Sequence, residues 1–270
     1  MKRIAKILAK IAVGFVFYIA ALYLIQDYVT FFPDKYYIAP SLAGVPSFEE
    51  VPVVMIDGEM VMTWYAKGDE NKPTLLFFHG NAGQIATFAP YMQLYIDAGY
   101  SILMMEYRGF GKTGGKISEE MMFADAIYVH DYLRNKLHKD RIIFFGYSMG
   151  TSVAVGLTQF RTPVGVILEA PFISLYQEVK EKPVPFASWV IKNRLESDKY
   201  ISKITQPLLI VHGEKDRLIP PHHGRTLFDL AASENKTFKL LEGETHNGLF
   251  FNENNHALIL EWLGENFGQE

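Results

Sequence analysis

The sequence predicts an α/β fold in which a mostly parallel sheet is covered by helices on both faces. From residue 50 onward, apolar runs of strand length alternate with stretches of helical length. The segment 146–150 reads Gly-Tyr-Ser-Met-Gly between the apolar run 142–145 and the helix-like stretch 151–160. A tight turn of this kind, placed between a strand and a helix, holds its serine exposed at the end of the strand. Ser148 is therefore the candidate nucleophile.

Residues 1–27 predict an uncleaved membrane anchor. The first ten residues carry four basic side chains and no acid, and residues 11–25 are uncharged and apolar up to Asp27. Counting back to Ile7, with Lys10 reaching the interface, gives the ~20 residues that a spanning helix needs. The basic flank predicts a single-pass protein with a cytoplasmic N-terminus and an extracytoplasmic catalytic domain.

Two alternatives remain for this segment, namely a cleaved signal peptide and an amphipathic helix at the membrane surface. The only cleavage-like site is Ile19-Ala20-Ala21, and more apolar residues follow it. Residues 28–47, rich in aromatic side chains and proline, predict a linker that packs on the domain or at the membrane interface.

Residues 48–270 predict one catalytic domain. The strand pair 51–56 and 60–66, separated by Asp57-Gly58, has the pattern of a hairpin. Buried strands are expected at 74–78 and 100–107, and further strands at 141–145, 164–169, 207–212 and 237–241. Helices are expected at 87–98, 118–138, 151–160, 221–232 and 249–267. The insertion at about 171–204, rich in aromatics and prolines, is placed where a small lid lies over the site.

A serine nucleophile needs a base to take its proton and an acid to orient that base. In a sheet of this type the acid and then the histidine follow the serine in the chain. Asp216 follows the strand 207–212, and His246 follows the strand 237–241, so both reach the same edge of the sheet as Ser148. The alternatives are Glu214 for the acid and a surface role for His246.

Other histidines fit the site less well. His212 ends a strand before the acid loop, and His222 and His223 begin a helix, where they are expected to cap it or to face solvent. His79 is expected to brace the loop that follows the strand 74–78.

Backbone N–H groups should stabilise the oxyanion of an acyl transfer reaction. One belongs to Met149, the residue after the nucleophile. The other is expected from Asn81, in the loop His79-Gly80-Asn81-Ala82-Gly83.

Composition excludes several classes of function. The chain has no cysteine and a net charge of −4, so thiolate chemistry and a basic nucleic-acid surface are excluded. Gly111-Lys112-Thr113 lacks the earlier glycine of a phosphate-binding loop, because that position is Glu106. No His-Glu-x-x-His motif or carboxylate cluster has metal spacing, so neither metal nor cofactor is expected.

Together these motifs resemble the α/β-hydrolase superfamily, and within it the Bem46-like branch of membrane-anchored serine hydrolases. The resemblance covers about residues 48–268 and rests on five segments: 79–83, 107–111, 146–150, 169–172 and 212–216. It implies Ser148, Asp216 and His246 as the triad, with Asn81 and Met149 as oxyanion donors. The branch often has a glycine-rich run before its histidine, whereas Glu244-Thr245 stands here.

The resulting hypothesis is a membrane-anchored serine hydrolase that cleaves carboxylic ester or thioester bonds of apolar, lipid-like substrates through an acyl-enzyme on Ser148. The aromatic insertion motivates the apolar substrate. The alternatives are an acyltransferase with the same triad and a non-catalytic scaffold on the same fold. A serine at position 148 excludes the members of this fold that use an aspartate nucleophile.

Overall fold

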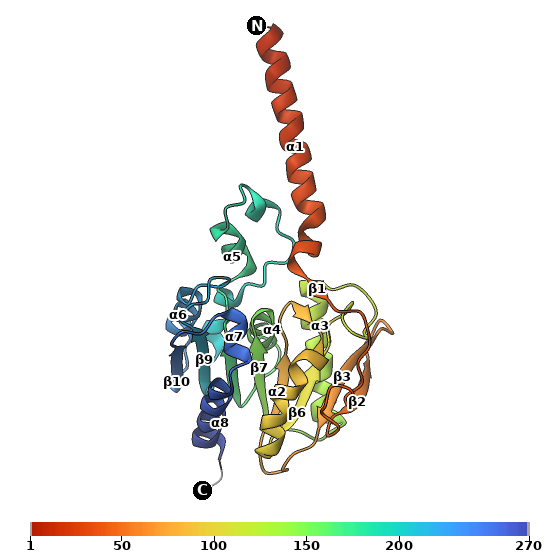
Figure 1. Cartoon of the computed structure of the whole chain (residues 1–270), viewed down its shortest axis with the longest axis vertical. Coiled ribbons are helices and arrows are strands. Elements are labelled where there is room, and N and C mark those ends of the chain that lie inside the picture. Colours follow the sequence, from red (N-terminus) through yellow and green to blue (C-terminus); the bar gives the residue numbers. More distant parts are fainter. Residues whose placement is uncertain (1, 269–270) are drawn as a thin grey trace.

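The computed structural model describes residues 2–268 and contains the predicted mostly parallel sheet (Figure 1). Its eight strands lie in the order β10-β9-β8-β7-β4-β6-β3-β2. The two pairings β2–β3 and β3–β6 are antiparallel, and the others are parallel. The strands are β2 (Glu49–Val54), β3 (Met60–Ala66), β4 (Thr74–Phe78), β6 (Ser101–Met105), β7 (Ile142–Tyr147), β8 (Gly165–Glu169), β9 (Leu208–Gly213) and β10 (Lys236–Leu241).

Helices cover both faces of this sheet, as the sequence predicts. Alternate residues of each strand point to opposite faces, so Leu76 and Phe78 join one apolar core while Leu75 and Phe77 join the other. The first core is closed by α3 (Glu119–Asn135), α4 (Met149–Leu157) and α6 (His222–Leu230). The second is closed by α2 (Ile85–Asp97), α7 (His246–Phe250) and α8 (Glu253–Phe267).

The C-terminal region differs from the single helix predicted at 249–267. Two helices form there, because two side chains each cap a new first turn. Thr245 accepts a hydrogen bond from the Gly248 N–H at the start of α7, and Asn252 accepts one from the Asn254 N–H at the start of α8. His246 is consequently the first residue of a helix rather than a loop residue.

The insertion between β8 and β9 contains α5 (Leu175–Glu181) and three short 3-10 helices. These are η1 (Ala187–Val190), η2 (Ser197–Lys199) and η3 (Ile201–Lys203). The part that contains α5 and η1 extends from the domain on the side where α1 leaves it (Figure 1).

The N-terminal segment forms α1 (Lys2–Thr30), which has no buried residue and is long and apolar enough to cross a membrane. It continues past Asp27, where the sequence predicted its end. Strand β1 (Phe32–Pro33) then pairs in parallel with β5 (Ala82–Gly83), and Phe31 is buried. The start of the predicted linker is therefore attached to the loop that follows β4.

Candidate active site

Ser148 occupies a sharp turn between β7 and α4. Its backbone has φ 51° and ψ −117°, a conformation that non-glycine residues rarely adopt and that is held here by the surrounding structure. A Cβ atom on Gly146 would collide with the backbone of Gly150, and one on Gly150 with the backbone of Phe78. The two glycines of the motif are thus required by close backbone approach.

The structure brings together the three side chains predicted as a triad. Ser148 Oγ lies 2.9 Å from His246 Nε2, and His246 Nδ1 lies 2.7 Å from Asp216 Oδ2. Because the carboxylate accepts the Nδ1–H, the Nε2 lone pair faces the serine hydroxyl. All three residues are buried, with 4 to 7% of their surface exposed.

Asp216 is fixed by the loop that follows β9. Its Oδ1 accepts the backbone N–H groups of Leu218, at 3.0 Å, and Ile219, at 2.8 Å. Burial by itself would raise the pKa of this carboxyl, but interactions with His212, His246 and the Ile219 N–H hold the pKa well below its ordinary value. The carboxylate therefore stays ionised next to His246.

The rival acid, Glu214, bonds elsewhere. Its Oε2 accepts the backbone N–H of Gly243 at 3.0 Å.

His212, set aside by the sequence analysis, contacts Asp216. Its Nε2 lies 3.5 Å from Asp216 Oδ2 and 2.9 Å from the Ile219 carbonyl oxygen.

The loop after β4 lies against the nucleophile. A Cβ atom on Gly80 would stand 3.6 Å from the Ser148 Cβ and 3.3 Å from a ring carbon of Tyr147, so this loop packs directly on the turn that holds the serine. Within residues 2–268, the backbone N–H groups of Asn81 and Met149 donate no hydrogen bond. Both predicted oxyanion donors are thus available on the two segments that flank the serine.

His79 braces this loop, as expected. Its Nδ1 lies 2.8 Å from the Gly80 carbonyl oxygen and its Nε2 lies 2.8 Å from Glu106 Oε1. Glu106, which the sequence analysis used only to exclude a phosphate loop, also accepts the Ile85 N–H at 3.0 Å. The sequence contained a signal for this role, because an acid that directly follows a fully buried strand needs hydrogen-bonding partners.

The end of α1 is bonded to the same loop, which the sequence did not indicate. Asn81 Nδ2 donates to the Thr30 carbonyl oxygen at 2.6 Å, and Phe32 N–H donates to the Asn81 carbonyl oxygen at 2.8 Å. The membrane-type helix therefore ends directly on one of the predicted oxyanion residues.

Comparison with known proteins shows the family of this chain. The family model described as serine aminopeptidase S33 matches residues 69–197 and 193–255. The chain belongs to this α/β-hydrolase family. Its similarity to the Schizosaccharomyces pombe protein bem46, 31% identity over 212 residues, 74% of this chain and 70% of that one, confirms the resemblance to the Bem46-like branch.

One further relative and one solved structure are similar to this chain. The lysophosphatidylserine lipase ABHD12 of Danio rerio is 31% identical over 192 residues, which are 63% of this chain and 50% of that protein. The chain thus matches about half the length of that lipase. An esterase of Pyrococcus furiosus superposes with a TM-score of 0.70 at 20% identity, over 87% of this chain and 97% of the esterase, and shows the fold.

One buried acid of this hydrolase lies next to the turn that holds Ser148, and the sequence analysis did not predict its role. Glu169 ends β8, and its carbonyl oxygen accepts the Ser148 N–H at 2.9 Å. Its side chain is fully buried; Asn255 Nδ2 donates to Oε1, and Oε2 has no partner within residues 2–268. Burial raises the pKa of Glu169 to about 8, opposed by the Asn255 hydrogen bond.

The expectation for His222 and His223 was wrong for His223, which is completely buried. Its Nδ1 accepts the Ile173 N–H at 3.2 Å, and its Nε2 lies 3.1 Å from Glu181 Oε2. The ligand atoms of Glu181, His222 and His223 lie within 4.8 Å of one another, close enough to surround one metal ion. However, a neutral His223 that accepts at Nδ1 carries its proton on Nε2, so His223 points no lone pair into this cluster.

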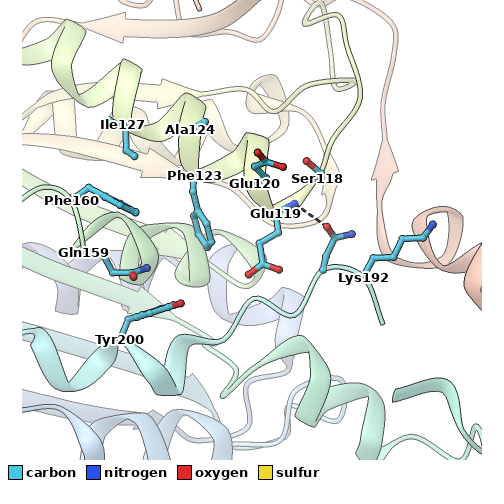
Figure 2. Close-up of a pocket in the computed structure, with 11 residues that line it drawn as sticks. Ser118, Glu119, Glu120, Phe123, Ala124, Ile127, Gln159, Phe160, Lys192 and Tyr200 are labelled. Carbon is cyan, nitrogen blue, oxygen red and sulfur yellow. Dashed lines mark hydrogen bonds between the residues drawn. The ribbon is translucent and has the colours of Figure 1, made fainter. Parts of the chain in front are cut away.

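A surface groove of about 650 Å³ is lined by none of the three triad residues (Figure 2). It lies between the first turns of α3 and residues 192–200 of the insertion. Asn193 Oδ1 accepts the Glu119 N–H at 2.9 Å, and the Arg194 N–H donates to Glu119 Oε2 at 2.6 Å. These contacts fix the base of the insertion on α3.

Proposed function

We propose that this hydrolase is anchored in a membrane and cleaves ester or thioester bonds of apolar, lipid-like acyl substrates through an acyl-enzyme on Ser148. The observation that carries the proposal is the continuous hydrogen-bond chain from Ser148 Oγ through His246 to Asp216. Its location at the glycine-flanked turn leaves the hydroxyl at the strand end, where an acyl carbon can approach.

In the proposed reaction, His246 Nε2 takes the proton of the Ser148 hydroxyl as Oγ attacks the acyl carbonyl carbon. Asp216 holds the Nδ1–H and stabilises the imidazolium that forms. His246 then gives its proton to the leaving alcohol or thiol. A water molecule, activated in the same way, hydrolyses the acyl-enzyme and regenerates Ser148.

The negative oxygen of the tetrahedral intermediate would be stabilised by the N–H groups of Asn81 and Met149. Their lack of partners within the described residues supports this role, since such donors must be free and fixed in place. His79 fixes one of these segments through the Gly80 carbonyl oxygen, and α4 fixes the other.

Two observations support a lipid-like substrate. Among the relatives, the Danio rerio protein is a lysophosphatidylserine lipase. In addition, the insertion exposes Val184, Phe186 and Trp189 on the side of the domain where α1 leaves.

The test is hydrolysis of ester and thioester substrates of graded acyl length by the full-length protein. We expect kcat/KM to rise from acetyl toward octanoyl esters, because each methylene bound in an apolar pocket contributes up to about 0.8 kcal/mol. Ser148→Ala should lower kcat by roughly 10⁴- to 10⁶-fold. The matched control is Ser152→Ala, a buried serine of α4 outside the triad, which should retain turnover.

A flat or falling profile from acetyl to octanoyl would refute the apolar substrate. Near wild-type turnover by a folded Ser148→Ala protein would refute the acyl-enzyme.

A further inference from the structure

The tip of the insertion is an uncharged apolar segment held against the membrane-type helix. Residues 183–191 read Pro-Val-Pro-Phe-Ala-Ser-Trp-Val-Ile and are flanked by Lys182 and Lys192. Trp189 has 69% of its surface exposed, and Val184 and Phe186 are exposed as well. An exposed apolar tip between two lysines has the composition of a segment that enters a membrane surface.

The tip contacts the apolar part of α1 rather than its end. The Tyr18 hydroxyl donates to the Pro185 carbonyl oxygen at 2.7 Å. The rings of Phe15 and Phe186 lie edge to face with centroids 5.3 Å apart. Both contact residues of α1 belong to the uncharged run 11–25, so the tip shares the level of that run along the helix.

The base of the tip lies near the polar end of the same helix. Gln26 Nε2 donates to the Val190 carbonyl oxygen at 3.0 Å, and its Oε1 accepts the Lys192 N–H at 2.7 Å. Lys192 Nζ lies 4.4 Å from the centre of the Tyr23 ring. From Gln26 to Phe15 the helix rises about 16 Å at 1.5 Å per residue, so the tip extends well beyond its base toward the N-terminus of α1.

We propose that residues 183–191 insert among the acyl chains of the lipid leaflet next to α1. This inference rests on the membrane anchor in the proposed function, because the contacts fix the tip relative to α1. The polar groups of Tyr18 and Gln26 bond to backbone atoms of the insertion, which removes the cost of unpaired polar groups at that depth. Lys182 and Lys192 then lie at the level of the headgroups.

The insertion joins the proposed membrane-inserted tip to the neighbourhood of the nucleophile. The insertion begins at the end of β8, where Phe172 packs in the same buried core as Met149, the residue after the nucleophile. The insertion is also bonded to α3 at its base (Figure 2) and to His223 of α6 through Ile173 and Glu181. The insertion thus connects the segment proposed to enter the leaflet with the core next to the nucleophile.

Trp189 is a natural probe for this proposal. The chain has three tryptophans, and the other two, Trp64 and Trp262, are almost completely buried in the domain. The full-length protein is reconstituted in phosphatidylcholine vesicles whose acyl chains either carry bromine atoms or do not. We expect brominated lipid to quench tryptophan emission, Trp189→Phe to remove most of this quenching, and Trp262→Phe to leave it in place.

Two results are contradictory to the proposal and can be told apart by flotation. Protein that floats with the vesicles, but whose Trp189 is quenched by aqueous iodide and not by brominated lipid, overturns the insertion of the tip alone. Protein that does not float refutes the anchor in the proposed function, and the inference falls with it.

A second measurement uses turnover. Phe186→Asp should lower kcat/KM for a long-chain ester presented in vesicles by roughly tenfold, because a carboxylate is costly at this depth. Hydrolysis of a water-soluble acetyl ester should be unchanged. The matched control is Ile56→Asp, a surface apolar residue at the β2–β3 turn with 86% exposure. Equal losses on both substrates would overturn the proposal.

Discussion

The site depends on a few side chains whose neighbours determine their chemistry. His246 has its two ring nitrogens between Ser148 and Asp216, and Asp216 is held in turn by backbone N–H groups. Glu214 lies only two positions from Asp216 in the sequence, yet its carboxylate accepts the Gly243 N–H instead. The two acids are therefore a matched pair for testing which one orients the histidine.

We expect Asp216→Asn to lower kcat by about 10⁴-fold. The amide oxygen would accept the Leu218 and Ile219 N–H groups, so the amide NH2 would donate to His246 Nδ1 and favour the wrong histidine tautomer. Glu214→Gln should leave kcat close to the wild-type value. Steady-state kinetics of both purified variants measures this. If Glu214→Gln has the larger effect, the acid is misassigned.

The sequence revealed those residues whose local turn carries the signal. Ser148 is marked by its flanking glycines, and Asp216 and His246 each follow a strand at the same edge of the sheet. Glu106 and His212 were not recognised as part of the site, because their roles depend on partners from distant segments. Non-local packing of this kind leaves no periodic pattern in one sequence.

Strand β8 and helix α8 meet at the buried carboxyl of Glu169, next to the turn that holds Ser148. Glu169 retains its proton up to about pH 8 in the fold, whereas an unfolded glutamate releases it near pH 4.5. Between these values the folded state binds more protons than the unfolded state, so the free energy of unfolding falls as pH rises. Above about pH 8 this contribution becomes constant.

In the wild type, this effect lowers the free energy of unfolding by a few kcal/mol between pH 5 and pH 8. We expect Glu169→Gln to lack this decrease, because glutamine does not titrate. Denaturant unfolding at a series of pH values measures the effect. Glu265→Gln, an exposed glutamate on α8, is the control and should follow the wild-type profile. Parallel profiles for Glu169→Gln and the wild type would show that the buried acid is ionised at pH 5.

The strands and most helices were predictable, since periodicity and glycine placement determine them locally. Strand β3 has the predicted bounds, and α3 begins after its predicted cap, Ser118, which accepts the Met121 N–H at 3.2 Å. The break between α7 and α8 depends on two side-chain caps, and the β1–β5 pairing joins segments about 50 residues apart, so the apolar pattern indicated neither.

At the scale of the whole molecule, α1, the insertion and the catalytic edge of the sheet lie at one end (Figure 1). The end of α1 is bonded to Asn81, and its middle contacts the insertion. With α1 anchored in a membrane as proposed, this arrangement would bring the candidate site close to the membrane surface.

We expect the catalytic domain on the extracytoplasmic side, because basic residues precede the apolar run while Asp27 follows it. External protease added to intact spheroplasts should remove a C-terminal tag from protein that sediments with membranes. A tag that is protected until the membrane is opened would reverse the orientation. A soluble protein whose N-terminus begins near Ala21 would show that the segment was a cleaved signal peptide.

The central claim, that Ser148 is the activated nucleophile, is tested most directly by labelling with a fluorophosphonate followed by peptide mapping. The account predicts one adduct on Ser148 in the wild type, none in Ser148→Ala, and strongly slowed labelling in His246→Ala, because the probe reacts with a serine only when a base takes its proton. A folded wild-type protein that stays unlabelled, or whose adduct lies on another residue, would contradict the account.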